Sequence, residues 1–179
     1  CEKVGFPIIL KQPDSAFSQG VKKVKTREEF DEVSTALFKD TELLIAQEFI
    51  QTDFDWRIGV LDRKPIYAAK YFMARKHWQI IANQKEGDAD YGKVEAVPVE
   101  LVPQAVMRSA VKSASLIGDG LYGVDVKQVG RLAYVIEVND NPSIDAGYED
   151  TLLKDTLYER VMEHFARKLD RRRERRVEE

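Results

Sequence analysis

The chain has 179 residues, 44% of them hydrophobic and 33% charged, and a formal net charge of −3, a composition that predicts a globular protein of one domain or two small lobes. The acidic balance argues against a general nucleic-acid-binding protein, because phosphate backbones attract a basic field, and the apolar runs are too short to span a membrane. A single cysteine, Cys1, permits no internal disulfide, so we expect a protein of the reducing cytoplasm.

Three strands are predicted in the first fifty residues. Each is a short, largely apolar run bounded by loop or turn residues such as Pro13 and Gly20. The strands are expected at residues 6–12, 21–25 and 43–50. Because the first strand begins almost at the start of a chain that opens with Cys1 rather than Met, we interpret the sequence as a fragment with a missing upstream part.

A helix is predicted between the second and third strands. Thr26 is followed three residues later by Glu29, which is the spacing of a capping box. Apolar side chains then recur at helical spacing, at Phe30, Val33 and Leu37. We therefore expect a small β-β-α-β lobe over residues 1–52.

A larger second lobe is predicted over residues 53–170. It opens with a hairpin whose strands, at residues 56–61 and 65–73, are joined by a turn at 62–64. Residues 84–93 are expected to form a mobile loop. The order of elements predicts the α+β class, with largely antiparallel sheets in two lobes around a cleft.

Two helices are predicted in this second lobe. The first should begin at Pro103 and end at Gly118 or Gly120. Apolar stripes define the two helices, at Val106, Ala110, Ala114 and Ile117 and at Leu153, Leu157, Val161, Phe165 and Leu169. The arginine-rich residues 171–179 are expected to form a basic, frayed tail, which we interpret as a solvated helix end rather than an interaction site.

Between these helices lies a hairpin that carries oxygen ligands. Asp125 and Glu137 lie on either side of a turn at Gly130, so antiparallel pairing can set them side by side. Asn139 lies two residues beyond Glu137 and shares its face of the strand. Two carboxylates about 4 Å apart repel by roughly 4 kcal/mol at an effective dielectric of about 20, so a cation is their natural occupant.

Oxygen ligands without Cys or His favour Mg²⁺ or Mn²⁺, and Mg²⁺ in turn usually binds substrate phosphates. The hairpin therefore predicts a metal-nucleotide site. An ordinary hairpin whose acids face solvent is the alternative, and the hairpin by itself would favour it.

Phosphate-binding residues are predicted in the first lobe. Lys11 ends the first strand and precedes a loop that contains Ser15, Ser18 and Gly20. A strand-terminal ammonium beside a loop of small residues can hold phosphates through its charge and through loop N–H groups and hydroxyls. A surface lysine followed by a plain loop explains the same residues equally well.

Other candidates lie near the start of the second lobe. Asp55 and Arg57 are two residues apart on a predicted strand and share a face, where Asp55 suits ribose hydroxyls and Arg57 suits a carboxylate or phosphate. A simple surface ion pair between them is the alternative. The spacing Gly118, Gly120, Gly123 matches a dinucleotide fingerprint, but it follows a predicted helix instead of opening one, so we interpret it as a helix terminator.

Taken together, these segments resemble the ATP-binding region of the ATP-grasp superfamily, most closely the RimK-type glutamate ligase and glutathione synthetase branch. The residues that carry the resemblance are 5–11, 15–20, 47–50, 55–57, 123–125 and 137–142. The resemblance implies an ATP-grasp fold in which two antiparallel sheets clasp ATP. It also implies that an upstream substrate domain and a further phosphate-binding lysine belong to the family pattern and are missing here.

By the same resemblance, specific residues would have specific roles. Lys11 and the loop with Ser15, Ser18 and Gly20 would hold phosphates, Glu48 and Ile50 would lie at the adenine, and Asp55 at the ribose. Asp125, Glu137 and Asn139 would bind Mg²⁺. Arg57, Lys70 and Asn83 are candidates for phosphate or acyl-acceptor contacts.

The activity that the resemblance implies is that of an ATP- and Mg²⁺-dependent carboxylate-amine ligase, which forms an amide through an acyl phosphate. Its partners would be small carboxylate and amine substrates, such as an amino acid, a peptide or a protein terminus. Gln79 stands where the branch usually has arginine, so the acceptor does not follow from the resemblance. The alternative function is a non-catalytic nucleotide-binding or regulatory module.

Overall fold

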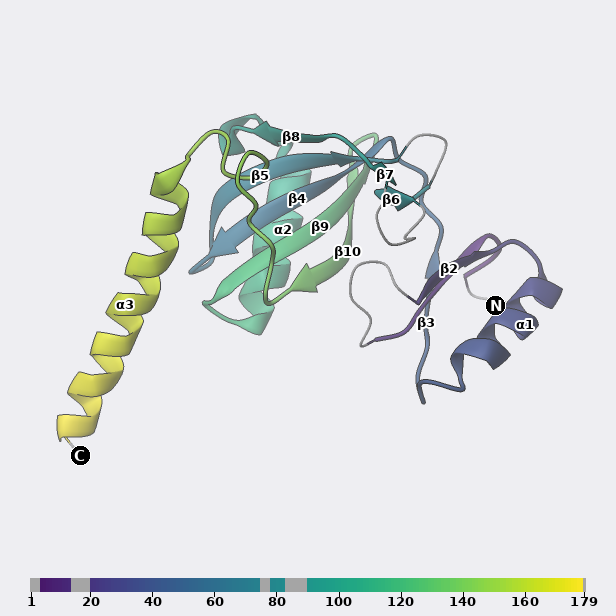
Figure 1. Cartoon of the computed structure of the whole chain (residues 1–179), viewed down its shortest axis with the longest axis horizontal. Helices are drawn as coiled ribbons and strands as arrows, with labels where there is room; N and C mark the ends of the chain where they lie inside the picture. The colour runs from purple at the N-terminus through teal and green to yellow at the C-terminus, as the bar shows by residue number, and fades with distance from the viewer. Residues whose placement is uncertain (1–3, 14–19, 75–77, 83–89, 179) are drawn as a thin grey trace. The chain divides into compact units, whose positions relative to one another are not determined.

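A computed structural model describes residues 4–13, 20–74, 78–82 and 90–178. The chain divides into two compact units, residues 1–51 and 52–179. Figure 1 shows the elements of both units. None of the helices in the described part of the chain combines the length and apolar character needed to span a bilayer.

The first unit is the predicted β-β-α-β arrangement. Strand β1 (Ile8–Lys11) lies between β2 (Val21–Val24) and β3 (Ile45–Glu48), and both pairings are antiparallel. Helix α1 (Arg27–Leu37) covers one face of this sheet. The predicted stripe packs against buried residues of β1 and β2, with Phe30, Val33 and Leu37 against Ile8, Leu10 and Val24.

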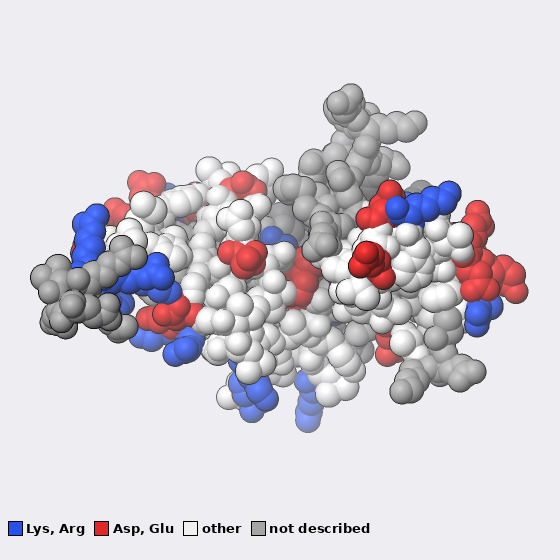
Figure 2. All heavy atoms as spheres, turned by 90° about the horizontal axis from the view of Figure 1, so that it is seen from below, with Lys and Arg blue, Asp and Glu red and all other residues white. Residues whose placement is uncertain are grey.

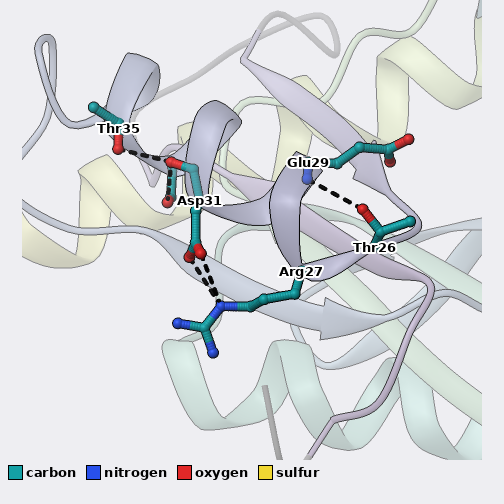
Figure 3. Close-up of polar contacts among 6 residues, drawn as sticks. Thr26, Arg27, Glu29, Asp31 and Thr35 are labelled. Carbon is teal, nitrogen blue, oxygen red and sulfur yellow. Dashed lines mark hydrogen bonds and ion pairs between the residues drawn. The ribbon is translucent and has the colours of Figure 1, made fainter.

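Helix α1 begins with the side-chain contacts shown in Figure 3. Thr26 is the N-cap, and its Oγ1 accepts a hydrogen bond of 3.2 Å from the N–H of Glu29. The return bond differs from that of a capping box, because the Glu29 carboxylate accepts from the N–H of Lys25 at 2.6 Å rather than from that of Thr26. The carboxylate thus ties the helix to the end of β2.

Replacing Thr26 by alanine is expected to destabilise the chain by about 1 kcal/mol, because an N–H group in the first turn loses its acceptor. Thr35→Ala is a matched control in the same helix. The Thr35 hydroxyl donates back to the carbonyl of Asp31 at 2.7 Å, and alanine is the better helix former. Urea unfolding followed by circular dichroism should show a loss for Thr26→Ala alone; equal losses for both would contradict the capping role.

The second unit is built on a five-stranded antiparallel sheet in the order β10-β9-β4-β5-β8. Its strands are β4 (Phe54–Leu61), β5 (Lys64–Phe72), β8 (Val94–Val97), β9 (Leu121–Val129) and β10 (Leu132–Asn139). The predicted hairpin turn holds two residues instead of three, since Asp62 and Arg63 both have positive φ and β5 begins at Lys64.

Helix α2 (Gln104–Ile117) packs on one face of this sheet (Figure 1). Pro103 is its N-cap and Gly118 its C-cap, which agrees with the predicted bounds. The main core joins Val106, Ala110 and Ala114 of α2 to alternate strand residues such as Ile58 and Val124. The predicted stripe is wrong at its last position, because Ile117 is 57% exposed.

Three short elements connect β5 to α2. They are β6 (Ile81–Ala82), β7 (Asp90–Tyr91) and the 3-10 turn η1 (Val99–Leu101), and β6 pairs with β7. In the predicted loop at 84–93, residues 90–91 are therefore strand. Residues 84–89 lie outside the described residues. Strand β8, which pairs with β5, was not predicted.

Helix α3 (Asp155–Glu178) continues through the basic segment that was predicted to be frayed. Only the first part of its predicted stripe is packed. Leu157 is fully buried against Leu61, Ile66 and Tyr67, whereas Leu169 is 55% exposed. Figure 2 shows Lys and Arg side chains gathered at the end of the molecule formed by this helix.

Candidate functional site

The hairpin of β9 and β10 brings Asp125 and Glu137 directly opposite each other. A β-bulge between Val135 and Glu137 makes this possible. The pairing nearer the turn, Val126 with Val135, would otherwise place Ile136 beside Asp125 and turn Glu137 toward the α2 face. The bulge moves the register by one residue, so both carboxylates lie on the face away from α2.

Asn139 lies on the same face, opposite Gly123. Its Nδ2 donates to Glu137 Oε1 at 3.1 Å and to the carbonyl of Gly123 at 3.4 Å. Both contacts use the nitrogen, so Oδ1 is the atom with which Asn139 could coordinate a cation. Among the described residues, no three His, Cys, Asp or Glu side chains are grouped to hold a metal; a metal here would need this amide oxygen.

Asp125 forms a two-bond ion pair with Arg57 on the neighbouring strand β4. Arg57 Nε donates to Oδ1 at 2.7 Å and Nη2 donates to Oδ2 at 2.8 Å. The two side chains are only 17% and 13% exposed. Burial by itself would lower the pKa of Arg57, but the charge and hydrogen bonds of Asp125 outweigh it and raise that pKa. Arg57 therefore stays cationic, with Asp125 rather than Asp55 as its ion-pair partner.

Asp55, two residues before Arg57 on β4, bonds to Lys127, two residues after Asp125 on β9. Lys127 Nζ donates to Asp55 Oδ1 at 2.5 Å and to Thr52 Oγ1 at 2.8 Å, and the Thr52 hydroxyl donates to Asp55 Oδ1 at 2.9 Å. Asp55 is 9% exposed. This geometry does not favour the predicted ribose contact, because the carboxylate is buried and already bonded within its unit.

Burial raises the pKa of Asp55 above its ordinary value of 3.8, although Lys127 and Thr52 oppose the shift. Between the unfolded and folded pKa values the folded chain binds more protons, so stability falls as pH rises through this window. Relative to Asp55→Asn, the wild type should therefore lose free energy of unfolding as pH increases from about 4. Urea unfolding of both proteins between pH 3.5 and 7 measures this; a relative gain with pH would contradict it.

Two glycines give this face of the sheet its shape. Gly59 and Gly123 are opposite each other on β4 and β9. A side chain at Gly59 would overlap the ring of Tyr67, and a Cβ at Gly123 would lie 2.7 Å from Pro142 Cβ. The Tyr67 ring and the loop that follows β10 can therefore approach the backbone beside the Arg57–Asp125 pair.

Tyr67 is 3% exposed, and its hydroxyl has no hydrogen-bond partner among the described residues. Burial raises its pKa, while Arg57 acts in the opposite direction. Glu149 is also buried, and its Oε2 accepts from the N–H of Asp145 at 2.8 Å. The protein interior next to the candidate site thus contains two buried side chains with polar groups.

Lys70 lies on the other face of the sheet. It pairs with Trp56 of β4 and Glu95 of β8, and its Nζ is 5.1 Å from the centre of the Phe54 ring and 5.3 Å from that of Trp56. Adjacent residues of a strand point to opposite faces, so Lys70 does not join Arg57 and Asp125. This placement argues against a shared role with Arg57 at the reacting groups.

The remaining candidates belong to the first unit or lie outside the described residues. Lys11 is the last residue of β1, and Gly20 has φ of 74° directly before β2. Glu48 ends β3, an edge strand of its sheet, and Ile50 follows two residues later. Among the described residues, β3 pairs with β1 along one edge, and the adenine contact of Glu48 and Ile50 stays a prediction. The candidates that lie outside the described residues are Ser15, Ser18 and Asn83.

Two basic residues near these candidates were not predicted. Lys127 lies two residues from Asp125 on β9, so the period of two could have indicated it. Lys23 pairs with Ile9 in β2 and, by alternation, shares the sheet face of Lys11. Its Nζ lies 3.2 Å from the centre of the Phe49 ring. The sheet face of Lys11 and the sheet face of Asp125 thus each carry one more lysine than the sequence motifs indicated.

Two open hollows among the described residues lie elsewhere, along α3. Their volumes are about 280 and 300 Å³, and Phe165 lines both. The first also includes Asp140, Asn141 and Pro142, directly after β10, and the second includes Lys168 and Arg172. Neither of these two hollows is lined by a predicted site residue.

Comparisons with known proteins show the family of the chain. A family model described as "RimK-like ATP-grasp domain" matches residues 1–154. A protein of Syntrophotalea carbinolica named "Probable alpha-L-glutamate ligase" is 31% identical over 153 residues, which are 84% of this chain and 48% of that protein. A "D-alanine--D-alanine ligase" of Geobacter sulfurreducens is 25% identical over 81% of this chain and 46% of its own length. The chain spans about half the length of these curated relatives.

Solved structures show the same fold. The crystal structure of D-alanine--D-alanine ligase from Bacillus anthracis complexed with ATP has a TM-score of 0.66 and 20% identity over 93% of this chain and 55% of that one. A biotin carboxylase from Campylobacter jejuni has a TM-score of 0.63 and 16% identity, covering 84% of this chain and 35% of that one. The expected α+β ATP-grasp fold is thereby confirmed.

Proposed function

Because the chain belongs to the RimK-like ATP-grasp family, we propose that its protein is an ATP- and Mg²⁺-dependent carboxylate-amine ligase and that this chain supplies the nucleotide-binding part. The observation that supports this best is the register of the β9–β10 hairpin. It places Asp125 opposite Glu137, with Asn139 on the same face. Two facing carboxylates repel unless positive charge offsets them; Arg57 supplies one such charge to Asp125, and a divalent ion shared by Asp125 and Glu137 would supply the rest.

The residues of this set fit a hard divalent ion. Two carboxylates and one amide oxygen are the donors that Mg²⁺ and Mn²⁺ prefer, and Mg²⁺ usually completes its shell with waters and phosphate oxygens. Asp125, Glu137 and Asn139 would hold the ion, which when bound neutralises charge on the transferring phosphoryl group. The other residues of the proposed site would act by binding and orienting the nucleotide.

In the proposed reaction a substrate carboxylate attacks the γ-phosphorus of ATP and ADP leaves. An amine then attacks the resulting acyl phosphate, the amide forms, and inorganic phosphate leaves. Lys11 and the segment with Ser15, Ser18 and Gly20 would hold phosphates, while Glu48 and Ile50 would bind adenine at the edge of β3. The roles predicted for Asp55 at the ribose and for Lys70 at phosphate or the acyl acceptor stay predictions. We build no step on them, because in the structure the two side chains pair with Lys127 and Glu95.

The substrates that we propose are a small carboxylate and an amine, each an amino acid, a peptide or a protein terminus, and we place the reaction in the cytoplasm. Turnover measured on the natural full-length polypeptide tests the proposal. Mg²⁺, ATP and a panel of amino acids and short peptides should release ADP and phosphate only when both an acceptor and a donor are present.

A non-catalytic nucleotide-binding module is the second candidate. It predicts that Mg²⁺-ATP binds, for example in a calorimetric titration, but that no member of the panel stimulates ADP release. Binding without turnover across a wide panel would favour the module, whereas acceptor-dependent ADP release would exclude it.

A further inference from the structure

Both carboxylate oxygens of Asp125, a predicted metal ligand, are bonded to a cationic side chain in the structure. We propose that Arg57 is a positioning residue, which orients Asp125 for the metal and supplies its counter-charge when the metal is absent. The inference rests on the proposed metal role of the hairpin. It replaces the expectation that Arg57 contacts phosphate or the acyl acceptor.

The geometry of the pair leaves room for a metal on Asp125. A carboxylate has about four lone-pair positions on its two oxygens, and a bidentate arginine uses about two of them. Nε and Nη2 of Arg57 take one oxygen each, at 2.7 and 2.8 Å. Each oxygen therefore keeps capacity toward Glu137, which lies on the opposite side of Asp125 from Arg57 because β9 is between β4 and β10.

Arg57 is itself held in place from several directions. Its guanidinium carbon lies 4.9 Å from the centre of the Tyr71 ring. Its Cδ runs past the bare backbone of Gly123, where an added Cβ would lie 3.6 Å away. Residue 57 also faces the small side chain of Ala69 on β5. A side chain confined in this way can fix the plane of a carboxylate, whereas a lysine in its place has no planar pair of donors.

One basic and two acidic side chains lie side by side on three neighbouring strands. Arg57, Asp125 and Glu137 form one row across β4, β9 and β10. Without a metal, Arg57 thus offsets the repulsion between the acids; with a metal bound, its two bonds would still orient Asp125.

Two effects of Arg57 on metal binding oppose each other. Its positive charge repels a divalent ion, but its two bonds hold Asp125 in the orientation that the ion needs. Loss of an outer partner of a metal ligand typically weakens metal affinity by about 10- to 100-fold. The burial and tight geometry of this pair indicate that orientation prevails, so removal of Arg57 should weaken binding rather than strengthen it.

The test is a titration of Mn²⁺ into the natural full-length polypeptide with ADP present, followed by electron paramagnetic resonance. Arg57→Met should bind Mn²⁺ about 10- to 100-fold more weakly than wild type. Arg57→Lys keeps the charge and loses the planar clamp, so we expect binding several-fold weaker than wild type. Arg131→Met, which removes a positive charge from the exposed turn of the same hairpin, is the control and should bind as wild type does.

Each outcome decides a separate point. Wild-type protein that binds no Mn²⁺ with ADP would overturn the proposed metal site, and this inference with it. Wild-type binding with unchanged or tighter binding by both Arg57 variants would overturn the inference alone. Should Arg57→Met fail to fold by circular dichroism, Arg57→Lys carries the test. Asp125→Asn supplies a further check, because an Arg57→Lys change added to it should have little extra effect on Mn²⁺ affinity.

Discussion

Replacing Glu137 by alanine is expected to lower acceptor-dependent ADP release by about 10³-fold or more, because a metal ligand offsets several kcal/mol of charge in the phosphoryl-transfer step and about 1.4 kcal/mol corresponds to tenfold in rate. The fold should survive. Glu137 lies in β10 at the edge of the sheet and on the face away from α2. Its removal also relieves the repulsion with Asp125.

The measurement is steady-state ADP release by the natural full-length polypeptide with saturating Mg²⁺, ATP and substrates. Glu100→Ala is the matched control, because Glu100 is an exposed acid of the same unit, in η1. Its turnover should equal that of wild type. Should Glu137→Ala retain more than about a tenth of wild-type turnover while its thermal unfolding is unchanged, the metal assignment is wrong, since a lost ligand costs more than one order of magnitude.

Substitution of Gly59 by alanine is expected to destabilise the second unit by about 3 kcal/mol, near the upper end for overpacked sites. Three atoms of the Tyr67 ring lie well inside contact distance of the added Cβ. The ring cannot move aside without disturbing Leu61, Ile66 and Leu157, with which it forms a buried cluster. The cost falls on both the sheet and the packing of α3.

Thermal unfolding measures this effect, with an expected fall in Tm of roughly 6–12 °C for a chain of this size. Gly120→Ala is the matched control: the atom nearest to its Cβ would be the Tyr122 hydroxyl oxygen at 3.4 Å. That change should cost under about 1 kcal/mol. Adding Tyr67→Leu to Gly59→Ala should restore part of the loss; a double variant as unstable as the sum of its parts would contradict the clash.

Local patterns were sufficient for much of the fold. The apolar spacing after Thr26 and the proline before α2 predicted helices that the structure contains, because helix stripes and caps depend on residues within a few positions of each other. Short elements escaped prediction. Strand β8 has four residues, all half-buried, and it exists because β5 offers a free edge for pairing; no local signal marks it.

The site divides in the same way. Its residue types were readable from the sequence, since Asp125, Glu137 and Asn139 flank an evident turn. The predicted pairing of Asp125 with Glu137 is confirmed, but it requires a bulge that no local pattern marks. A regular ladder from the turn would place Ile136 beside Asp125, and packing against α2 decides which residues of β10 face the core. Backbone pairing alone does not choose between the two registers.

Ion-pair partners were beyond the sequence as well. Asp55 and Arg57, two residues apart, suggested a pair with each other, but in the structure each bonds to β9, Asp55 to Lys127 and Arg57 to Asp125. Neighbouring strands bring directly opposed side chains closer than side chains two apart on one strand. The sequence by itself thus determined the small lobe, the helices and the oxygen-bearing side chains that the hairpin carries. The tertiary structure decided which charges meet, because partner choice depends on strands that are far apart along the chain.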